Sequence, residues 1–192
     1  QWRAQAAWIE EGLASSDWLA GEAPGLADVA AYMNIWFLAR NLPAVADELL
    51  AGLTRTQGWR ELVVKSKQAH WDEQKVLTEV NRFFNQLTFL NDVVLWGRND
   101  YWAAPMEFLG AGGGDCEDYS IAKYFTLLEL GFPDEKLRMV YVKSLTYQQF
   151  HMVVAYYPTP AAVPLILDNI DGIIKPATKR KDLVPVYSFN GS

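Results

Sequence analysis

The chain has 192 residues, of which 51% are hydrophobic and 14% aromatic, as in a packed globular protein rather than a disordered one. Its net charge is −6 and it has no long stretch rich in lysine and arginine. This argues against nucleic-acid binding, because phosphate contacts need a basic face. No apolar run approaches the roughly 20 residues of a membrane span, so we expect no membrane insertion. The N-terminus also lacks the pattern of a signal peptide.

Composition changes abruptly near residue 53. Residues 1–53 contain 13 alanines and no lysine, whereas residues 54–192 contain all 9 lysines and only 9 alanines. We therefore predict two parts, a helical segment over 1–53 and a separate domain over 54–192.

Within the first part, helices are expected over 2–14, 26–39 and 44–51 from the helical spacing of apolar residues. The stretch "WLAGEAPGLADVAAYMNIWFL" (18–38) weakly resembles the C-terminal helical domain of glutathione-transferase-like proteins. The half of those proteins that binds glutathione has no counterpart here, so the resemblance implies no transferase activity.

The second part is predicted to begin with helices. "WRELVVKSK" (59–67) starts one helix, and 72–88 has the apolar stripe of an amphipathic helix. A long loop with large aromatic residues is expected over 95–114, followed by a helix over 116–130 that stops at Gly131.

Strands are expected after these helices, over 137–144, 150–157 and 163–169. Helices first and antiparallel strands second is the pattern of an α+β fold.

The only cysteine, Cys116, excludes an intramolecular disulfide and a zinc site made of cysteines. It follows three glycines and starts the helix over 116–130. The exposed amides and the dipole at a helix start are expected to lower the pKa of a thiol. The glycines would let a substrate backbone approach, and the amides could donate to an oxyanion.

His151 and Asp168 are candidate partners of Cys116. His151 is the second residue of a predicted strand and Asp168 ends the next, so an antiparallel pairing can bring the two side chains together. His151 would then take the thiol proton and Asp168 would orient it. A small buried cysteine, a hydrogen-bonded core histidine and an aspartate at a strand end explain the same residues without catalysis.

Residues from about 55 to 192 resemble the bacterial transglutaminase-like cysteine proteinases of the LapG type. The resemblance is carried by "VNRFFNQL", "LWGRNDYWAAPMEFLGAGGGDCEDYSIAKYFTLLELG", "YVKSLTYQQFHMVVAYYPTP", "LILDNIDG" and "PVYSFNGS". The triad of that family falls on Cys116, His151 and Asp168.

The resemblance implies a papain-like or transglutaminase-like fold, with a helical N-terminal lobe packed on an antiparallel sheet. It also implies endoproteolysis in the periplasm. The expected substrate is a large LapA-type surface adhesin, cut near its N-terminus at a di-alanine site to release biofilm. The expected regulator is an inner-membrane LapD-type receptor for cyclic-di-GMP.

The same family is calcium-dependent, and its calcium ligands beside the cysteine fall on Asp115 and Glu117. Asp118 is added from its position. Carboxylates are hard oxygen ligands that suit Ca²⁺, although acidic residues at a helix start also favour the helix dipole without any ion. Two other functions remain open: a transglutaminase or acyltransferase on the same triad, and a non-enzymatic calcium-binding module.

Overall fold

The computed structural model describes residues 43–191, so the helices predicted over 2–14 and 26–39 lie outside the described residues. Contacts divide the chain into two compact units, residues 1–50 and 51–192, and the second contains nearly all of the described residues. Within the described part, no helix is both long enough and apolar enough to cross a membrane.

Helix α3 (Pro43–Gln68) is one continuous helix, where the sequence predicts a short helix over 44–51 and another starting at 59. Pro43 suits the first helical position, where its missing N–H is not needed. Gly52 lies inside α3 without breaking it, because glycine costs a helix only about 1 kcal/mol. A Cβ on Gly52 would lie 3.1 Å from the carbonyl oxygen of Gly110, so the glycine permits a close approach of two backbones.

Helix α4 (Glu73–Phe84) confirms the predicted amphipathic helix and ends four residues earlier than expected. The Asp72 side chain caps its start by accepting a hydrogen bond from the Lys75 N–H at 2.7 Å. The buried face consists of Val76, Leu77, Val80, Asn81 and Phe84.

The segment predicted as a loop over 95–114 is partly helical. It follows the short helix α5 (Asp92–Leu95) and contains helix α6 (Pro105–Ala111). Strands β1 (Thr88–Phe89) and β2 (Gly113–Gly114) then pair in parallel. A seven-residue helix spans only two turns, too few for its apolar periodicity to stand out in the sequence.

Helix α7 (Cys116–Glu129) confirms the predicted helix, and Gly131 follows it with a φ of +89°. Buried side chains surround most of this helix, including Ile121 and Tyr124, whereas Phe125 is 44% exposed. Helix α7 is therefore the central helix of the second unit, packed against both α4 and the sheet.

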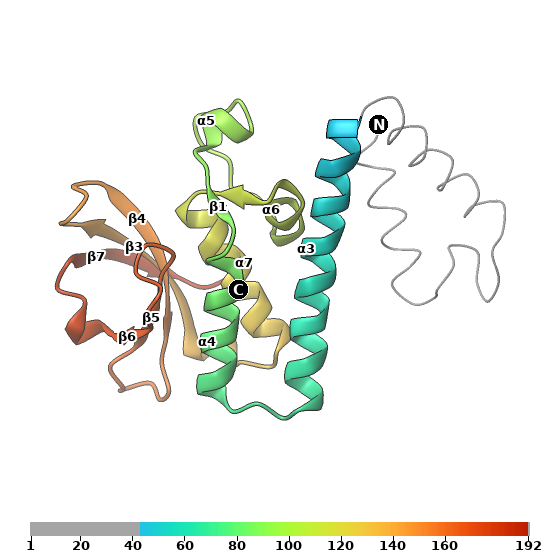
Figure 1. Cartoon of the computed structure of the whole chain (residues 1–192). Helices are drawn as coiled ribbons and strands as arrows, with labels where there is room; N and C mark the ends of the chain where they lie inside the picture. The colour runs from blue at the N-terminus through green and yellow to red at the C-terminus, as the bar shows by residue number, and fades with distance from the viewer. Residues whose placement is uncertain (1–42, 192) are drawn as a thin grey trace. The chain divides into compact units, whose positions relative to one another are not determined.

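The main sheet has five antiparallel strands in the order β6-β5-β4-β3-β7. Figure 1 shows this sheet on one side of α4 and α7. Three strands confirm the prediction, but β6 and β7 were not predicted. The strands are β3 (Leu137–Ser144), β4 (Phe150–Tyr156), β5 (Leu165–Leu167), β6 (Lys175–Pro176) and β7 (Leu183–Phe189).

The two faces of this sheet have different partners. Leu137, Met139, Met152 and Val154 join the large core formed with the helices. The opposite face carries a smaller apolar cluster of Val142, Val153, Ala155 and Ile166. The architecture is the predicted α+β fold, with helices packed on an antiparallel sheet.

Candidate active site

Cys116 is the first residue of α7, and its side chain is partly buried against the large core. The preceding residue, Asp115, adopts an extended conformation, and α7 turns away from β2 at this point. The structure therefore has the thiol at the predicted position, the N-terminal end of the central helix.

The glycines before Cys116 are required by packing within the protein. A Cβ on Gly113 would lie 2.3 Å from the carbonyl oxygen of Thr88, and one on Gly114 would lie 2.2 Å from Oδ2 of Asp118. Gly112 has a φ of +74°, which few other residues adopt readily. The sequence predicts that these glycines let a substrate approach, whereas the structure shows contacts of the chain with itself.

His151 and Asp168 form a buried pair. Nε2 of His151 lies 2.7 Å from Oδ1 of Asp168, and the two residues are 2% and 1% exposed. The antiparallel pairing of β4 with β5 brings them together, because His151 is in β4 and Asp168 directly follows β5. This contact is the one predicted from the order of the strands.

Asp168 is held from several sides. Its Oδ1 accepts a second hydrogen bond from the Ile170 N–H at 2.9 Å, and its Oδ2 accepts one from Nη2 of Arg180 at 2.7 Å. The Asn85 side chain, just after α4, donates to its backbone oxygen at 2.8 Å. Burial acts to raise the pKa of the Asp168 carboxyl, but the hydrogen bonds from His151, Ile170 and Arg180 hold it well below its usual range.

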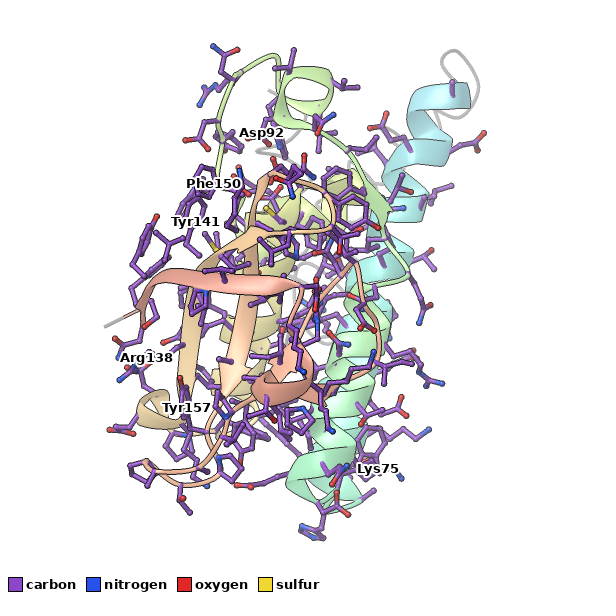
Figure 2. All side chains as sticks on the ribbon, turned by 90° about the vertical axis from the view of Figure 1, so that its left-hand side faces the viewer. Lys75, Asp92, Arg138, Tyr141, Phe150 and Tyr157 are labelled. Carbon is purple, nitrogen blue, oxygen red and sulfur yellow. The ribbon has the colours of Figure 1, made fainter. Side chains whose placement is uncertain are left out.

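The thiol of Cys116 lies beside β4. The backbone of Met152, the residue after His151, lies close enough to the thiol to act against the rise in its pKa. In Figure 2, the labelled residues Asp92, Tyr141 and Phe150 gather at one end of the molecule, while Lys75 lies at the other. Because Phe150 precedes His151 in β4 and Asp92 lies beside Asp115, the start of α7 and the histidine lie at the same end of the second unit.

Burial raises the pKa of the Cys116 thiol, and the negative charge of Glu117 adds to this effect. The thiol also donates a hydrogen bond to Oε2 of Glu117 at 3.0 Å. The position of Cys116 at a helix start predicts a lowered pKa. In this structure the lowered pKa is not found, because burial and the neighbouring carboxylates raise it instead.

Five carboxylates gather around this end of α7, and we call them the acid cluster: Asp92, Asp100, Asp115, Glu117 and Asp118. Ligand atoms of Asp92, Asp100 and Glu117 lie within 4.8 Å of one another, and so do those of Asp92, Asp115 and Asp118. The predicted ligands Asp115, Glu117 and Asp118 therefore meet two further acids, from α5 and from the loop after it.

The acid cluster has the properties of a cation site. Oδ1 of Asp92 and Oδ1 of Asp115 are buried and have no hydrogen-bond partner among the described residues. Burial and the charge of Glu117 raise the pKa of Asp115 to about 9, and burial is also the main cause of the raised pKa of Asp92. A cation bound among these oxygens would give the two unpaired oxygens a partner and would offset the repulsion between the carboxylates.

Asp118 also has a structural contact on each oxygen. Its Oδ1 accepts a hydrogen bond from the Ala103 N–H at 2.7 Å, and its Oδ2 accepts one from the Asp115 N–H at 3.1 Å. Burial raises its pKa to about 6 although both hydrogen bonds act in the opposite direction. Asp118 therefore fixes the start of α7, and only the remaining lone pairs of its oxygens are available to an ion.

Three residues of this site were not singled out from the sequence: Asp92, Asp100 and Arg180. Asp92 and Asp100 precede Cys116 by 24 and 16 positions and carry no motif of their own. Arg180 lies in the segment "PATKRKD" among other basic residues. Only the fold brings these side chains to the residues that were predicted.

Comparisons with known proteins identify the family. A family model described as bacterial transglutaminase-like cysteine proteinase matches residues 56–182. A search of curated proteins gave no match.

Solved structures of LapG from Legionella pneumophila match the fold. One is 45% identical with a TM-score of 0.68 and covers 73% of this chain and 77% of that protein. A calcium-bound LapG structure is 42% identical with a TM-score of 0.69 and covers 83% of each chain. An EGTA-treated LapG structure is 45% identical with a TM-score of 0.67, covering 72% of this chain and 74% of that one. The chain therefore belongs to the bacterial transglutaminase-like cysteine proteinases, within which it is LapG-like.

Proposed function

We propose that this protein is a calcium-dependent cysteine endopeptidase in which Cys116 is the nucleophile, His151 the general base and Asp168 the residue that orients the imidazole. The observation that carries the proposal is the buried hydrogen bond of 2.7 Å between His151 and Asp168. The residue after His151 in β4, Met152, lies beside the Cys116 thiol. Membership of a cysteine proteinase family supports the same assignment.

The proposed reaction follows from the ring atoms of His151. Because Nε2 bonds to Asp168, Nδ1 is the atom that takes the proton from the Cys116 thiol. The thiolate attacks the scissile carbonyl, and backbone amides of the first turn of α7 stabilise the oxyanion. His151 then protonates the leaving amine as the C–N bond breaks, leaving a thioester on Cys116. Water, deprotonated by His151, hydrolyses the thioester and restores the thiol.

Calcium is proposed to bind in the acid cluster. Asp115, Glu117 and Asp118 are the ligands expected from the sequence, and Asp92 and Asp100 add two more carboxylates. Ca²⁺ takes about 6–8 oxygen ligands, so backbone carbonyls and water would complete the set. When bound, the ion supplies positive charge that offsets the carboxylates around the thiol. A calcium-bound structure among the LapG matches supports this proposal.

The proposed substrate is a large LapA-type surface adhesin, cut in its N-terminal region at a di-alanine site so that biofilm is released. We place the reaction in the periplasm and propose a LapD-type cyclic-di-GMP receptor as the regulator. These proposals rest on the likeness to LapG over most of the chain.

Cleavage of a purified N-terminal adhesin fragment tests the function. The wild-type protein is expected to cut the fragment in calcium, to stop when EGTA is added, and to recover with excess calcium. Cys116→Ala is expected to lower the rate by a factor of about 10³ or more. Retained cleavage in Cys116→Ala would contradict the role of the thiol, and full cleavage by metal-free protein would contradict the calcium requirement.

The same reaction mixtures can reveal acyl transfer. A transglutaminase would share the thioester but pass the acyl group to an amine rather than to water. Incorporation of a labelled amine without net hydrolysis would therefore replace the proteolytic assignment with this alternative.

A further inference from the structure

Arg180 is a buried cation that touches the catalytic pair but has no part in the reaction described above. It follows the short helix η2 (Ala177–Lys179), and only 5% of its surface is exposed. Its Nη2 donates to Oδ2 of Asp168 at 2.7 Å, the oxygen that His151 does not use. The two carboxylate oxygens of Asp168 therefore face different partners, the base on one side and a guanidinium on the other.

A second carboxylate fixes Arg180. Nη2 of Arg180 also donates to Oδ2 of Asp182 at 2.7 Å, and its Nε donates to Oδ1 of Asp182 at 3.0 Å. Paired contacts of this kind fix both the position and the plane of a guanidinium. The result is a continuous chain of charge-assisted hydrogen bonds running from Asp182 through Arg180 and Asp168 to His151.

We propose that Arg180 is a positioning residue for the proteolytic reaction, holding the Asp168 carboxylate ionised and turned so that its Oδ1 meets His151. This inference rests on the proposed function of His151 as the base. The guanidinium acts on His151 through Asp168 and does not itself touch the substrate.

The surroundings of Asp168 explain why Arg180 matters. A buried carboxylate without a cation tends to take up a proton, and a protonated Asp168 could no longer stabilise an imidazolium. The charged groups facing Asp168 are His151 from β4, Arg180 from the segment before β7, and Lys123 from α7. Among the described residues, Arg180 supplies the hydrogen bond to Oδ2, whereas Lys123 acts on Asp168 through its charge. Asp182 and Asp171 surround the guanidinium on its other side.

Two variants separate the charge of Arg180 from its hydrogen bond. Arg180→Gln removes the charge, and Arg180→Lys keeps the charge but loses the planar fork. Removing the charge raises the pKa of Asp168, so the ionised form is lost at a higher pH as the solution is acidified. We expect the acid limb of kcat for adhesin-fragment cleavage to move to higher pH in Arg180→Gln. We expect kcat at pH 7 to fall roughly 10-fold with KM unchanged.

Arg180→Lys should keep the wild-type acid limb while its kcat falls by less. Arg82→Gln is the matched control, because Arg82 is an exposed arginine paired with Glu79 in its own helix. An acid limb that is the same in Arg180→Gln and wild type would overturn the proposal. Should Arg180→Gln fail to fold by circular dichroism, Arg180→Lys decides the question, and a wild-type kcat in that variant would refute it.

Proton NMR gives a readout that does not need activity. The ring N–H of His151 that donates to Asp168 should give a far-downfield resonance, and His70→Gln distinguishes it from the other histidine. In Arg180→Gln this signal should weaken at a higher pH than in the wild type, whereas in Arg82→Gln it should not change. If the wild-type protein cleaves no fragment, the proposed function fails, yet the NMR titration still confirms or refutes the action of Arg180 on Asp168.

Discussion

At the scale of single residues, the site combines charges that are unfavourable when each is considered alone. Burial and the surrounding carboxylates raise the pKa of the Cys116 thiol, and one of these carboxylates, Glu117, accepts a hydrogen bond from it. Asp168 is the opposite case, since three donors hold its pKa below the usual range. The Cys116 thiolate thus needs a positive charge that its neighbours among the described residues do not supply. Asp168, in contrast, already has the guanidinium of Arg180 beside it.

Lys123 is a second buried cation, with 1% of its surface exposed in α7. Burial lowers its pKa to about 7, and the charge of Asp168 acts in the opposite direction. In the unfolded chain the amine titrates near 10.5. The buried charge therefore destabilises the fold fully below about pH 7, and stability is regained as the pH rises from about 7 towards 10.5.

Lys123→Met is expected to raise the free energy of unfolding by about 1–4 kcal/mol at pH 6, because a methionine of similar shape removes the buried charge. The gain should shrink at pH 9, where the wild-type amine is already neutral in the fold. Urea unfolding at the two pH values measures this difference. The exposed Lys67→Met should change stability by less than about 0.5 kcal/mol at either pH, and an equal gain for Lys123→Met at both pH values would contradict the assignment.

At the scale of elements, the segment between α6 and α7 is fixed by backbone contacts. Gly113 pairs with Thr88 in the short parallel bridge, and Gly114 makes room for Asp118. The position of Cys116 thus depends on a bridge between β1 and β2 as well as on its own helix.

Gly113→Ala is expected to destabilise the protein by roughly 2 kcal/mol or more, because its Cβ would overlap the carbonyl oxygen of Thr88. Gly110→Ala is the matched control, since a Cβ there meets nothing within 4 Å and alanine favours a helix by about 1 kcal/mol. Thermal unfolding of both variants tests the prediction. If Gly113→Ala and Gly110→Ala unfolded at the same temperature, the pairing of β1 with β2 would tolerate a Cβ and the prediction would be wrong.

The start of α7 is expected to depend on Asp118 independently of any ion. Asp118→Ala removes the acceptor of two backbone N–H groups and should cost roughly 2–4 kcal/mol, measured by urea unfolding in EGTA. Glu129→Ala, at the far end of α7, breaks only an exposed pair with Lys67 and should cost about 0.5 kcal/mol or less. If the two variants lose the same stability, Asp118 does not cap the helix.

At the scale of the whole molecule, the acid cluster joins segments that are distant in sequence. Asp92 comes from α5, Asp100 from the loop beyond it, and Asp115 and Glu117 from the start of α7. A ligand that binds only the folded cluster stabilises the whole fold by mass action.

Calcium is therefore expected to raise the thermal midpoint of the wild-type protein, corresponding to about 2.7 kcal/mol at a concentration 100 times the Kd. Asp92→Asn should lose most of this gain, because it removes a buried carboxylate with an unpaired oxygen. Glu135→Gln, an exposed acid outside the cluster, should keep it. A calcium-induced shift of wild-type size in Asp92→Asn would exclude Asp92 as a ligand, whatever the activity.

The local elements near the site were predicted well and their neighbours less well. The helix from Cys116 has 14 residues and the strand with His151 has 7, and each has a continuous apolar pattern that the sequence shows directly. Strand β7 was not predicted, because Pro185 interrupts its pattern and most of its side chains are exposed. The predicted segments before residue 43 lie outside the described residues.

The sequence by itself determined the α+β order of elements, the place of Cys116 at a helix start, and the pairing of His151 with Asp168 on neighbouring strands. These depend on local periodicity and on short antiparallel connections. Only the tertiary structure decided that Asp92 and Asp100 join the acid cluster, that Arg180 holds Asp168, and that burial raises the pKa of the thiol. Burial and contacts between distant segments depend on how the whole chain packs, and no local pattern specifies them.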